Sequence, residues 1–156
     1  VLQFGLCGYF ATVQTPDENA FITKKTGGSA AWLGGNMRQT NDTTKQMKWV
    51  DPAAPEYNQI FSTGTKSGGA GWGVGTTIAN SYTVNGITYR YENWNNGEPN
   101  NAGPETALQI LTGGAGNWND LNEASASLPY VIEFGDSPKD NPTGAGSRTS
   151  VITWHY

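Results

Sequence analysis

The sequence predicts an α+β fold, and three observations lead to that prediction. With 156 residues, the chain is about the length of one domain and can bury a core without metal or disulfide staples. Short segments rich in β-forming residues stand between polar, glycine-rich stretches, which is typical of short strands. One segment near the start of the chain has the start and stop signals of a helix. We therefore expect short antiparallel strands with one or two helices.

The helix is predicted from both of its ends. Thr15 can cap it, Pro16 suits its first position, and Glu18 stands three residues after Thr15, as in a capping box. The glycines at 27–28 end it after about Lys25. The residues expected to face the core are Ala20, Phe21 and the stem of Lys24.

The strand candidates combine β-branched, aromatic and aliphatic residues. They are residues 9–14, 30–34, 46–50, 88–91, 106–111 and 129–134. Residues 1–8 suggest the last turn of a helix that enters a loop. From residue 36 to 101 we expect mostly loop around the two short strands, and a loop of that length is usually functional.

The chain divides into a domain of residues 1–135 and a linker-like tail of residues 136–156. The tail is rich in Pro, Gly and Ser as far as Ser150. It ends in Val151–Tyr156, an apolar and aromatic segment that is a candidate edge strand.

The composition argues against several kinds of partner and site. The net charge is −4, and the nine Lys and Arg residues are scattered. Binding to nucleic acid or to an anionic membrane surface would need a basic stripe. No run of about 18 apolar residues is present, so no segment is expected to insert into a membrane. Cys7 is the only cysteine, which rules out an intrachain disulfide and a cysteine-based zinc site.

One cluster of residues has the chemistry of a cation site. Its members are Glu98, Asn100, Glu105, Asn119 and Asp120. They lie in two loops that flank one predicted strand, and they offer three carboxylates and two amide oxygens. Ca²⁺ binds about six to eight oxygen ligands of these kinds. A cis peptide bond before Pro99 would point the flanking side chains of Glu98 and Asn100 into the same site.

These residues and their surroundings resemble the C-type lectin-like domain, in its prokaryotic, disulfide-free form. The motifs Glu98-Pro99-Asn100, then Glu105, then Trp118-Asn119-Asp120 resemble the sugar-binding loops of that family. Residues 8–22, 31–35 and 130–134 resemble its strand and second helix, its core strand and its closing strand. The resemblance covers roughly residues 5–135, in the family's order.

The resemblance implies a role for each residue of the cluster. Glu98, Asn100, Glu105, Asn119 and Asp120 would ligate Ca²⁺ through their side chains, with the backbone carbonyl of Asp120 as a further ligand. Sugar hydroxyls would complete the coordination and form hydrogen bonds with Glu98, Asn100, Glu105 and Asn119. The Glu-Pro-Asn pattern implies mannose, fucose, glucose or N-acetylglucosamine rather than galactose, because exchanging acid and amide reverses the donors and acceptors around the metal. The chain is then a glycan-binding adhesion module and not an enzyme.

The chain also departs from the family pattern. The two usual disulfides are absent, as in many prokaryotic members. Thr106 stands where many members have an acid for a second calcium ion, although Asn41 and Asp42 lie in the loop that would supply its other ligands. The family's first strand and most of its first helix should precede Gly5. We therefore expect a fragment of a larger multidomain protein, at the bacterial surface or otherwise extracellular, with Val151–Tyr156 in the missing strand position as the alternative.

Two other functions remain open at this point. One is a protein-binding or ice-binding module on the same fold, with a structural calcium ion and contacts through residues 36–93. The other is a glycosidase that uses Glu98 and Glu105, although a tightly bound cation would hold both carboxylates ionised and leave no general acid.

The remaining conspicuous residues have mostly structural interpretations. Trp94 and Trp118 are expected in the core, and Trp72 and Tyr82 are candidates for stacking on a sugar. The glycines of Gly68–Gly75 indicate a flexible loop rather than a phosphate loop, because no strand precedes them and no helix follows. We expect Cys7 to be a small, buried apolar residue and His155 to lie on the edge strand.

Overall fold

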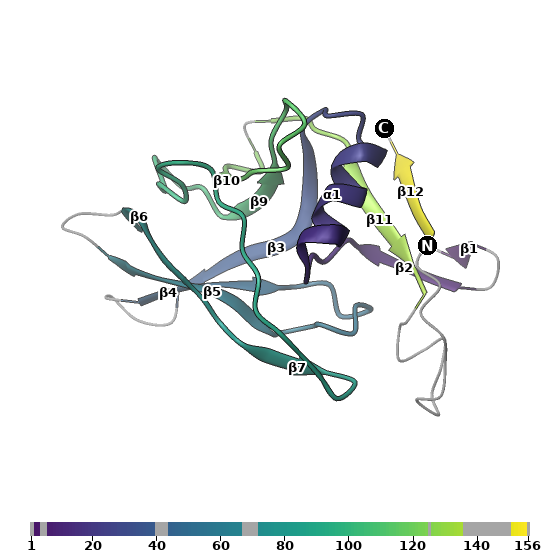
Figure 1. Ribbon diagram of the computed structural model, residues 1–156. Coiled ribbons are helices and arrows are strands. Elements are labelled where there is room, and N and C mark those ends of the chain that lie inside the picture. Colours follow the sequence, from purple (N-terminus) through teal and green to yellow (C-terminus); the bar gives the residue numbers. More distant parts are fainter. Residues whose placement is uncertain are drawn as a thin grey trace.

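The structure is a computed structural model, and it describes residues 2–3, 6–39, 44–66, 72–124, 126–135 and 151–155. Within these residues it has one helix and twelve strands (Figure 1). The helix is α1 (Pro16–Lys25). The strands are β1 (Leu2–Gln3), β2 (Leu6–Phe10), β3 (Ala31–Gln39), β4 (Thr44–Trp49), β5 (Ile60–Lys66), β6 (Trp72–Ala79), β7 (Tyr82–Val84), β8 (Ile87–Tyr89), β9 (Ala107–Ile110), β10 (Trp118–Leu121), β11 (Tyr130–Phe134) and β12 (Val151–His155). The architecture is α+β, as predicted, and the described helix is not long and apolar enough to cross a membrane.

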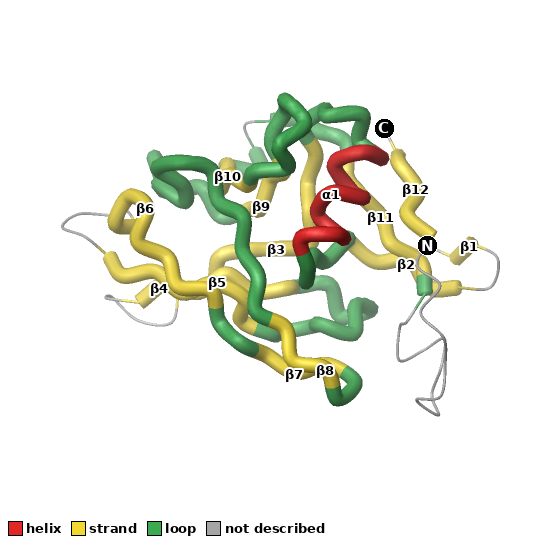
Figure 2. The backbone as a smooth tube through the Cα atoms, viewed as in Figure 1, coloured by secondary structure: helices red, strands yellow, loops and turns green. Residues whose placement is uncertain are grey.

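Ten of the described strands form one sheet. Its main path runs β1-β2-β11-β3-β4-β5-β6, and β9 joins β3, β10 joins β9, and β12 joins β11. β7 and β8 form a separate hairpin (Figure 2). All described pairs are antiparallel except β11 with β3, which meet in parallel at Tyr130 and Trp32. β9 and β10 are thus fixed to the middle of the sheet through β3.

Helix α1 begins and ends where the sequence predicts. The hydroxyl oxygen of Thr15, its N-cap, accepts a hydrogen bond from the Glu18 N–H at 3.2 Å, and Pro16 is its first residue. It ends at Lys25, two residues before Gly27, whose φ is +61°.

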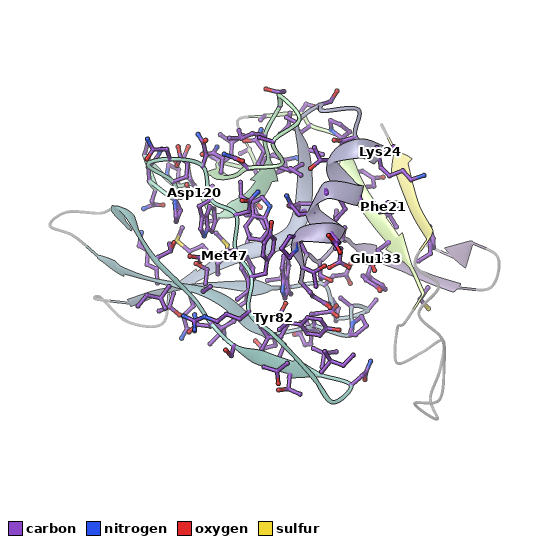
Figure 3. The ribbon with its side chains drawn as sticks, in the orientation of Figure 1. Phe21, Lys24, Met47, Tyr82, Asp120 and Glu133 are labelled. Carbon is purple, nitrogen blue, oxygen red and sulfur yellow. The ribbon has the colours of Figure 1, made fainter. Side chains whose placement is uncertain are left out.

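The predicted inward face of α1 is wrong. Asn19, Ile22 and Thr23 are buried, whereas Ala20, Phe21 and Lys24 are exposed (Figure 3 labels the last two). Two polar residues can be buried here because each has partners: Asn19 accepts from the Trp118 indole N–H at 2.9 Å and donates to the Gly116 carbonyl at 3.0 Å. The hydroxyl of Thr23 donates to the Asn19 carbonyl at 2.7 Å.

The core is built around large aromatic side chains. Trp49 stacks on Phe61 with 4.1 Å between ring centroids, and Phe61 meets Trp118 edge to face at 5.8 Å. Trp118 is fully buried and half-buried Trp94 packs against it, as expected. Tyr82 is also buried, and its hydroxyl oxygen accepts a hydrogen bond from the Trp49 indole at 3.1 Å. Tyr82 is therefore not exposed, and it is excluded as a candidate for stacking on a sugar.

The prediction of a long loop from residue 36 to 101 is also wrong. β3 extends to Gln39, and β4, β5 and β6 follow as an antiparallel ribbon. β4 agrees with the strand predicted at residues 46–50, whereas β5 and β6 are rich in Thr, Ser and Gly and lack the alternation of apolar and polar residues that marks a half-buried strand. Their stability comes from backbone pairing with neighbouring strands, which composition does not record.

The two ends of the described chain are strands. Residues 6–10 form β2, which pairs with β11, so the predicted helical turn in residues 1–8 is wrong. β12 pairs with the whole of β11, from Tyr130↔His155 to Phe134↔Val151, which is the position of an edge strand. Cys7 is half-buried. Asn41, Asp42, residues 67–71 and the side chain of Trp72 lie outside the part of the chain that the structure describes.

Candidate functional site

The candidate site begins with a segment held against β10. The Trp118 N–H donates to the Asn93 carbonyl at 2.8 Å, and the Asn95 N–H donates to the Trp118 carbonyl at 2.9 Å. The Glu98 N–H then closes a turn on the Asn95 carbonyl at 2.9 Å. Gly97 in this turn has a φ of +85°, a conformation that glycine adopts without strain. The peptide bond from Glu98 to Pro99 is cis.

Asp120 joins β10 to the residues that follow this turn. Its Oδ1 accepts from the Asn100 N–H at 3.0 Å, and its Oδ2 accepts from the Asn101 N–H at 2.9 Å. The Asp120 side chain is fully buried, so both backbone bonds are shielded from water. Residues about 20 positions apart in the sequence are thereby brought together.

Glu98, Asn100 and Glu105 are linked by a second set of hydrogen bonds. Glu98 accepts from the Asn100 backbone N–H at 3.0 Å and from the Asn100 side-chain amide at 2.9 Å. The Ala102 N–H is shared between the Asn100 Oδ1, at 2.7 Å, and the Glu105 Oε2, at 2.8 Å. Four of the five predicted ligands therefore form one connected group.

Two carboxylates of this group, Asp120 and Glu105, have a raised pKa, chiefly because of burial. Burial raises the pKa of Asp120 to about 6, and the nearby charge of Glu98 adds to that rise, against the lowering effect of the Asn100 and Asn101 N–H groups. Burial also raises the pKa of Glu105, with Asp120 as a further cause. The site is thus a region of negative potential, and a bound cation would relieve it.

Asn119 does not take part in the hydrogen bonds that join the other four predicted ligands. Its side-chain amide donates to the Gln109 Oε1 on the neighbouring strand β9 at 3.1 Å. Along β10 the side chains alternate, so that Trp118 and Asp120 are buried and Asn119 is half-buried. Among the described residues, no group of three or more His, Cys, Asp or Glu side chains is arranged to hold a metal ion.

The chemistry of the connected group nevertheless fits a hard cation. The side-chain atoms that could ligate a metal are carboxylate oxygens of Glu98, Glu105 and Asp120 and the amide oxygen of Asn100. These are the ligand types of calcium. The group has no thiolate or imidazole, the softer ligands that select zinc or copper.

A polar cavity of about 340 Å³ adjoins Glu98. It is lined by Thr77 of β6 and by residues 92–98. Sequence reasoning did not select Thr77 or Glu92. Glu92 lies in the run from Tyr91 to Asn101 that carries the family resemblance, so the sequence indicates it indirectly. Thr77 has no such indication, because only the pairing of β5 with β6 brings it to Glu92.

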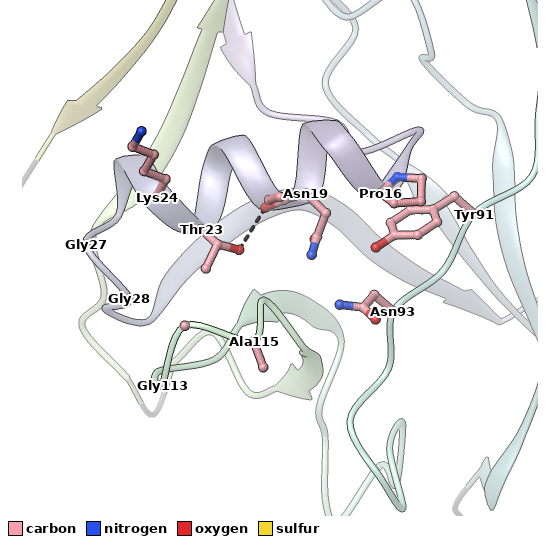
Figure 4. A pocket seen from close by; sticks show the side chains of 12 residues that line it. Pro16, Asn19, Thr23, Lys24, Gly27, Gly28, Tyr91, Asn93, Gly113 and Ala115 are labelled. Carbon is pink, nitrogen blue, oxygen red and sulfur yellow. Dashed lines mark hydrogen bonds between the residues drawn. The ribbon is translucent and has the colours of Figure 1, made fainter.

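A larger cavity, of about 710 Å³, lies between α1 and the turn at residues 113–115 (Figure 4). Tyr91 and Asn93 line it as well, but none of the predicted cation ligands does. The Asn93 side-chain amide donates to the Gly116 carbonyl at 2.7 Å, so that group already has a partner. Volume alone does not make this cavity a functional site.

The chain has a weak similarity to a solved structure. No family model matches the chain. A solved structure of the cow C-type carbohydrate-recognition domain of CD23, crystallised in the presence of a GlcNAc2Man3 oligosaccharide, is similar, with a TM-score of 0.42 and 22% sequence identity. The similarity covers 72% of this chain and 58% of the cow chain, so this chain spans less than two thirds of that domain.

Proposed function

We propose that this chain is a calcium-dependent carbohydrate-binding domain of the C-type lectin type. The observation that supports this most is the hydrogen-bonded group of Glu98, Asn100, Glu105 and Asp120, assembled from two segments around β9. These are the positions that the Glu-Pro-Asn and Trp-Asn-Asp motifs assign to the calcium site. Within the described part of the chain, the hydrogen-bond partners of these carboxylates are amide groups and not Lys or Arg side chains. That is the expected state of such a site before the metal binds.

Each residue would have a distinct part in binding. Glu98, Asn100, Glu105 and Asp120 would hold Ca²⁺ directly, and Asn119 would join them after its amide leaves Gln109. Ca²⁺ would act as a Lewis acid that binds two neighbouring sugar hydroxyls. The carboxylates of Glu98 and Glu105 would accept hydrogen bonds from these hydroxyls, and the amides of Asn100 and Asn119 would donate to them.

The same arrangement gives the selectivity. With acid at 98 and amide at 100, the site favours the hydroxyl orientation of mannose, fucose and N-acetylglucosamine over that of galactose. Affinity for one sugar should be low, because extracellular calcium modules typically bind calcium at about 10⁻⁴–10⁻³ M and few hydroxyls are desolvated. Useful binding would come from several copies acting together. This fits an extracellular, non-enzymatic adhesion module of a larger, bacterial surface protein.

The test is thermal unfolding with calcium, with a chelator, and with calcium plus a single sugar. Calcium at about 100 times its Kd should add about 2.7 kcal/mol to the free energy of unfolding. Mannose, fucose or N-acetylglucosamine should add a further rise and galactose should not. Glu98→Gln and Asn100→Asp should remove the sugar response, whereas the exposed control Glu123→Gln should keep it.

The outcomes separate the candidate functions. A rise with calcium and none with any sugar would support the protein-binding or ice-binding module with a structural calcium ion. No rise with calcium would mean that Glu98, Asn100, Glu105 and Asp120 do not form a calcium site. Turnover of a glycoside by the calcium-loaded protein would support the hydrolase.

A further inference from the structure

The cavity beside Glu98 is walled by a strand that contributes none of the proposed calcium ligands. Thr77 belongs to β6, the last strand on the main path of the sheet, and residues 92–98 form the rest of the lining. Its volume of about 340 Å³ is at the lower end of the range of about 300–1,000 Å³ for small-ligand pockets. The cavity is therefore large enough for one small polar unit of a ligand that starts at Glu98.

The wall of this cavity is held in place by its own hydrogen bonds. Glu92 accepts from the Ser62 hydroxyl at 2.7 Å and from the Thr77 hydroxyl at 3.0 Å. Trp94 donates from its indole to the same Ser62 hydroxyl at 3.2 Å and packs on the core. Side chains that are fixed in this way lose little conformational freedom when a ligand binds.

The cavity also has hydrogen-bonding capacity to offer a ligand. Within the described part of the chain, the Asn95 Nδ2 and the Asn96 side-chain amide make no hydrogen bond. Each oxygen of the Glu92 carboxylate already accepts one bond and has a second lone pair. Planar amides next to a carboxylate supply both donors and acceptors, which is what sugar hydroxyls require.

We propose that this cavity is a second sugar subsite, which binds the residue next to the one at the calcium site. The inference rests on the proposed function, because Glu98 belongs to both places. Glu92 and Glu98 line the cavity, and no Lys or Arg among the described residues does. The second residue is therefore a neutral sugar, since a uronic acid or a sulfated sugar would meet two carboxylates. The natural ligand is then a neutral oligosaccharide or polysaccharide and not a single terminal sugar.

The test compares one sugar with two in calcium buffer, by calorimetric titration. The probes are mannose with mannobiose, N-acetylglucosamine with N,N′-diacetylchitobiose, and an acidic disaccharide that contains a uronic acid. One or two additional hydrogen bonds should make the matching neutral disaccharide bind about tenfold more tightly than its monosaccharide. The acidic disaccharide should show no such gain.

Variants locate the gain in the cavity. Thr77→Val and Asn96→Ala should each lose most of the disaccharide gain, with the monosaccharide affinity unchanged. Thr83→Val is the matched control, because Thr83 is an exposed strand threonine whose hydroxyl bonds with that of Thr88, outside this cavity. It should keep the full gain.

Three results would overturn the subsite. The first is equal affinity for monosaccharide and disaccharide in the unmodified protein, which leaves the calcium-site proposal intact. The second is a disaccharide gain that survives in both Thr77→Val and Asn96→Ala, which would place the second sugar elsewhere. The third is the lack of calcium-dependent binding of any monosaccharide or disaccharide, which would overturn the proposed function and the subsite with it.

Discussion

Replacement of Asp120 by asparagine should change how the stability of the calcium-free protein depends on pH. The Asp120 side chain is fully buried, and its pKa rises from 3.8 to about 6 in the folded protein, first because of burial. A group whose pKa is higher in the folded state stabilises the fold below its unfolded pKa, and that stabilisation is lost as the pH rises through the folded value. In the chelated protein, Asp120 should therefore favour the fold at acidic pH and not at neutral pH.

The size of the effect follows from the two pKa values. One pKa unit corresponds to about 1.4 kcal/mol, so the full difference is about 3 kcal/mol. Between about pH 4.5 and about pH 7.5, linkage gives a loss of about 2 kcal/mol from Asp120. The amide introduced by Asp120→Asn has no such proton equilibrium, and Glu105, whose pKa is also raised, is present in both proteins.

The assay is urea unfolding of both proteins in chelator across this pH range. The free energy of unfolding of the unmodified protein should fall by about 2 kcal/mol more than that of Asp120→Asn. Added calcium should restore stability at neutral pH in the unmodified protein and have little effect on the variant. Parallel pH profiles for the two chelated proteins would show that Asp120 is not a buried, electrostatically strained carboxyl.

Three further substitutions test how the fold supports the site. Thr15→Ala removes the N-cap of α1 and should lower the free energy of unfolding by about 1 kcal/mol in urea titrations; an unchanged midpoint would contradict the capping role. Asn19→Ala leaves the buried Trp118 indole N–H without its acceptor and should cost about 1–3 kcal/mol by the same measurement; Asn19→Asp keeps the acceptor but sets a buried carboxylate against the Gly116 carbonyl, so it should not restore the stability. Gly34→Ala would place a Cβ 2.8 Å from the Phe10 carbonyl oxygen, which is a backbone atom, and should lower the melting temperature by several degrees. A Tm equal to that of the parent would mean that the backbones of β2 and β3 can move apart at no cost.

The sequence predicted the parts of the fold that are set by local chemistry. Thr15, Pro16 and Glu18 define the helix start through contacts within four residues, and the structure has those contacts. Strands β9 and β11 are short apolar runs, and they were predicted to within one residue at each end. The buried face of α1 was not predictable by the same means, because Asn19 and Thr23 are buried by partners almost 100 positions away or by the helix backbone.

The candidate site, too, was predicted from the sequence only in part. The motifs identified Glu98, Asn100, Glu105 and Asp120, and the structure joins these four through backbone N–H groups of residues 100–102. Whether they and Asn119 hold calcium stays a prediction. The contribution of Thr77 to the neighbouring cavity was missed, because Thr77 is one of many threonines and only the β5–β6 pairing brings its hydroxyl to Glu92.

Because β6 lies at the end of the main path of the sheet, the residues proposed to bind calcium and the residue proposed to select a second sugar come from different parts of the fold. The proposed calcium ligands come from residues 98–120, whereas Thr77 lies on β6, whose neighbour on the main path is β5. In the proposed subsite, substitution of Thr77 would therefore change which second sugar is accepted without removing a proposed calcium ligand. For protein engineering, this favours variation in β6 over variation in β5, because β5 carries the core residue Phe61 and the Ser62 hydroxyl that holds Glu92 and Trp94.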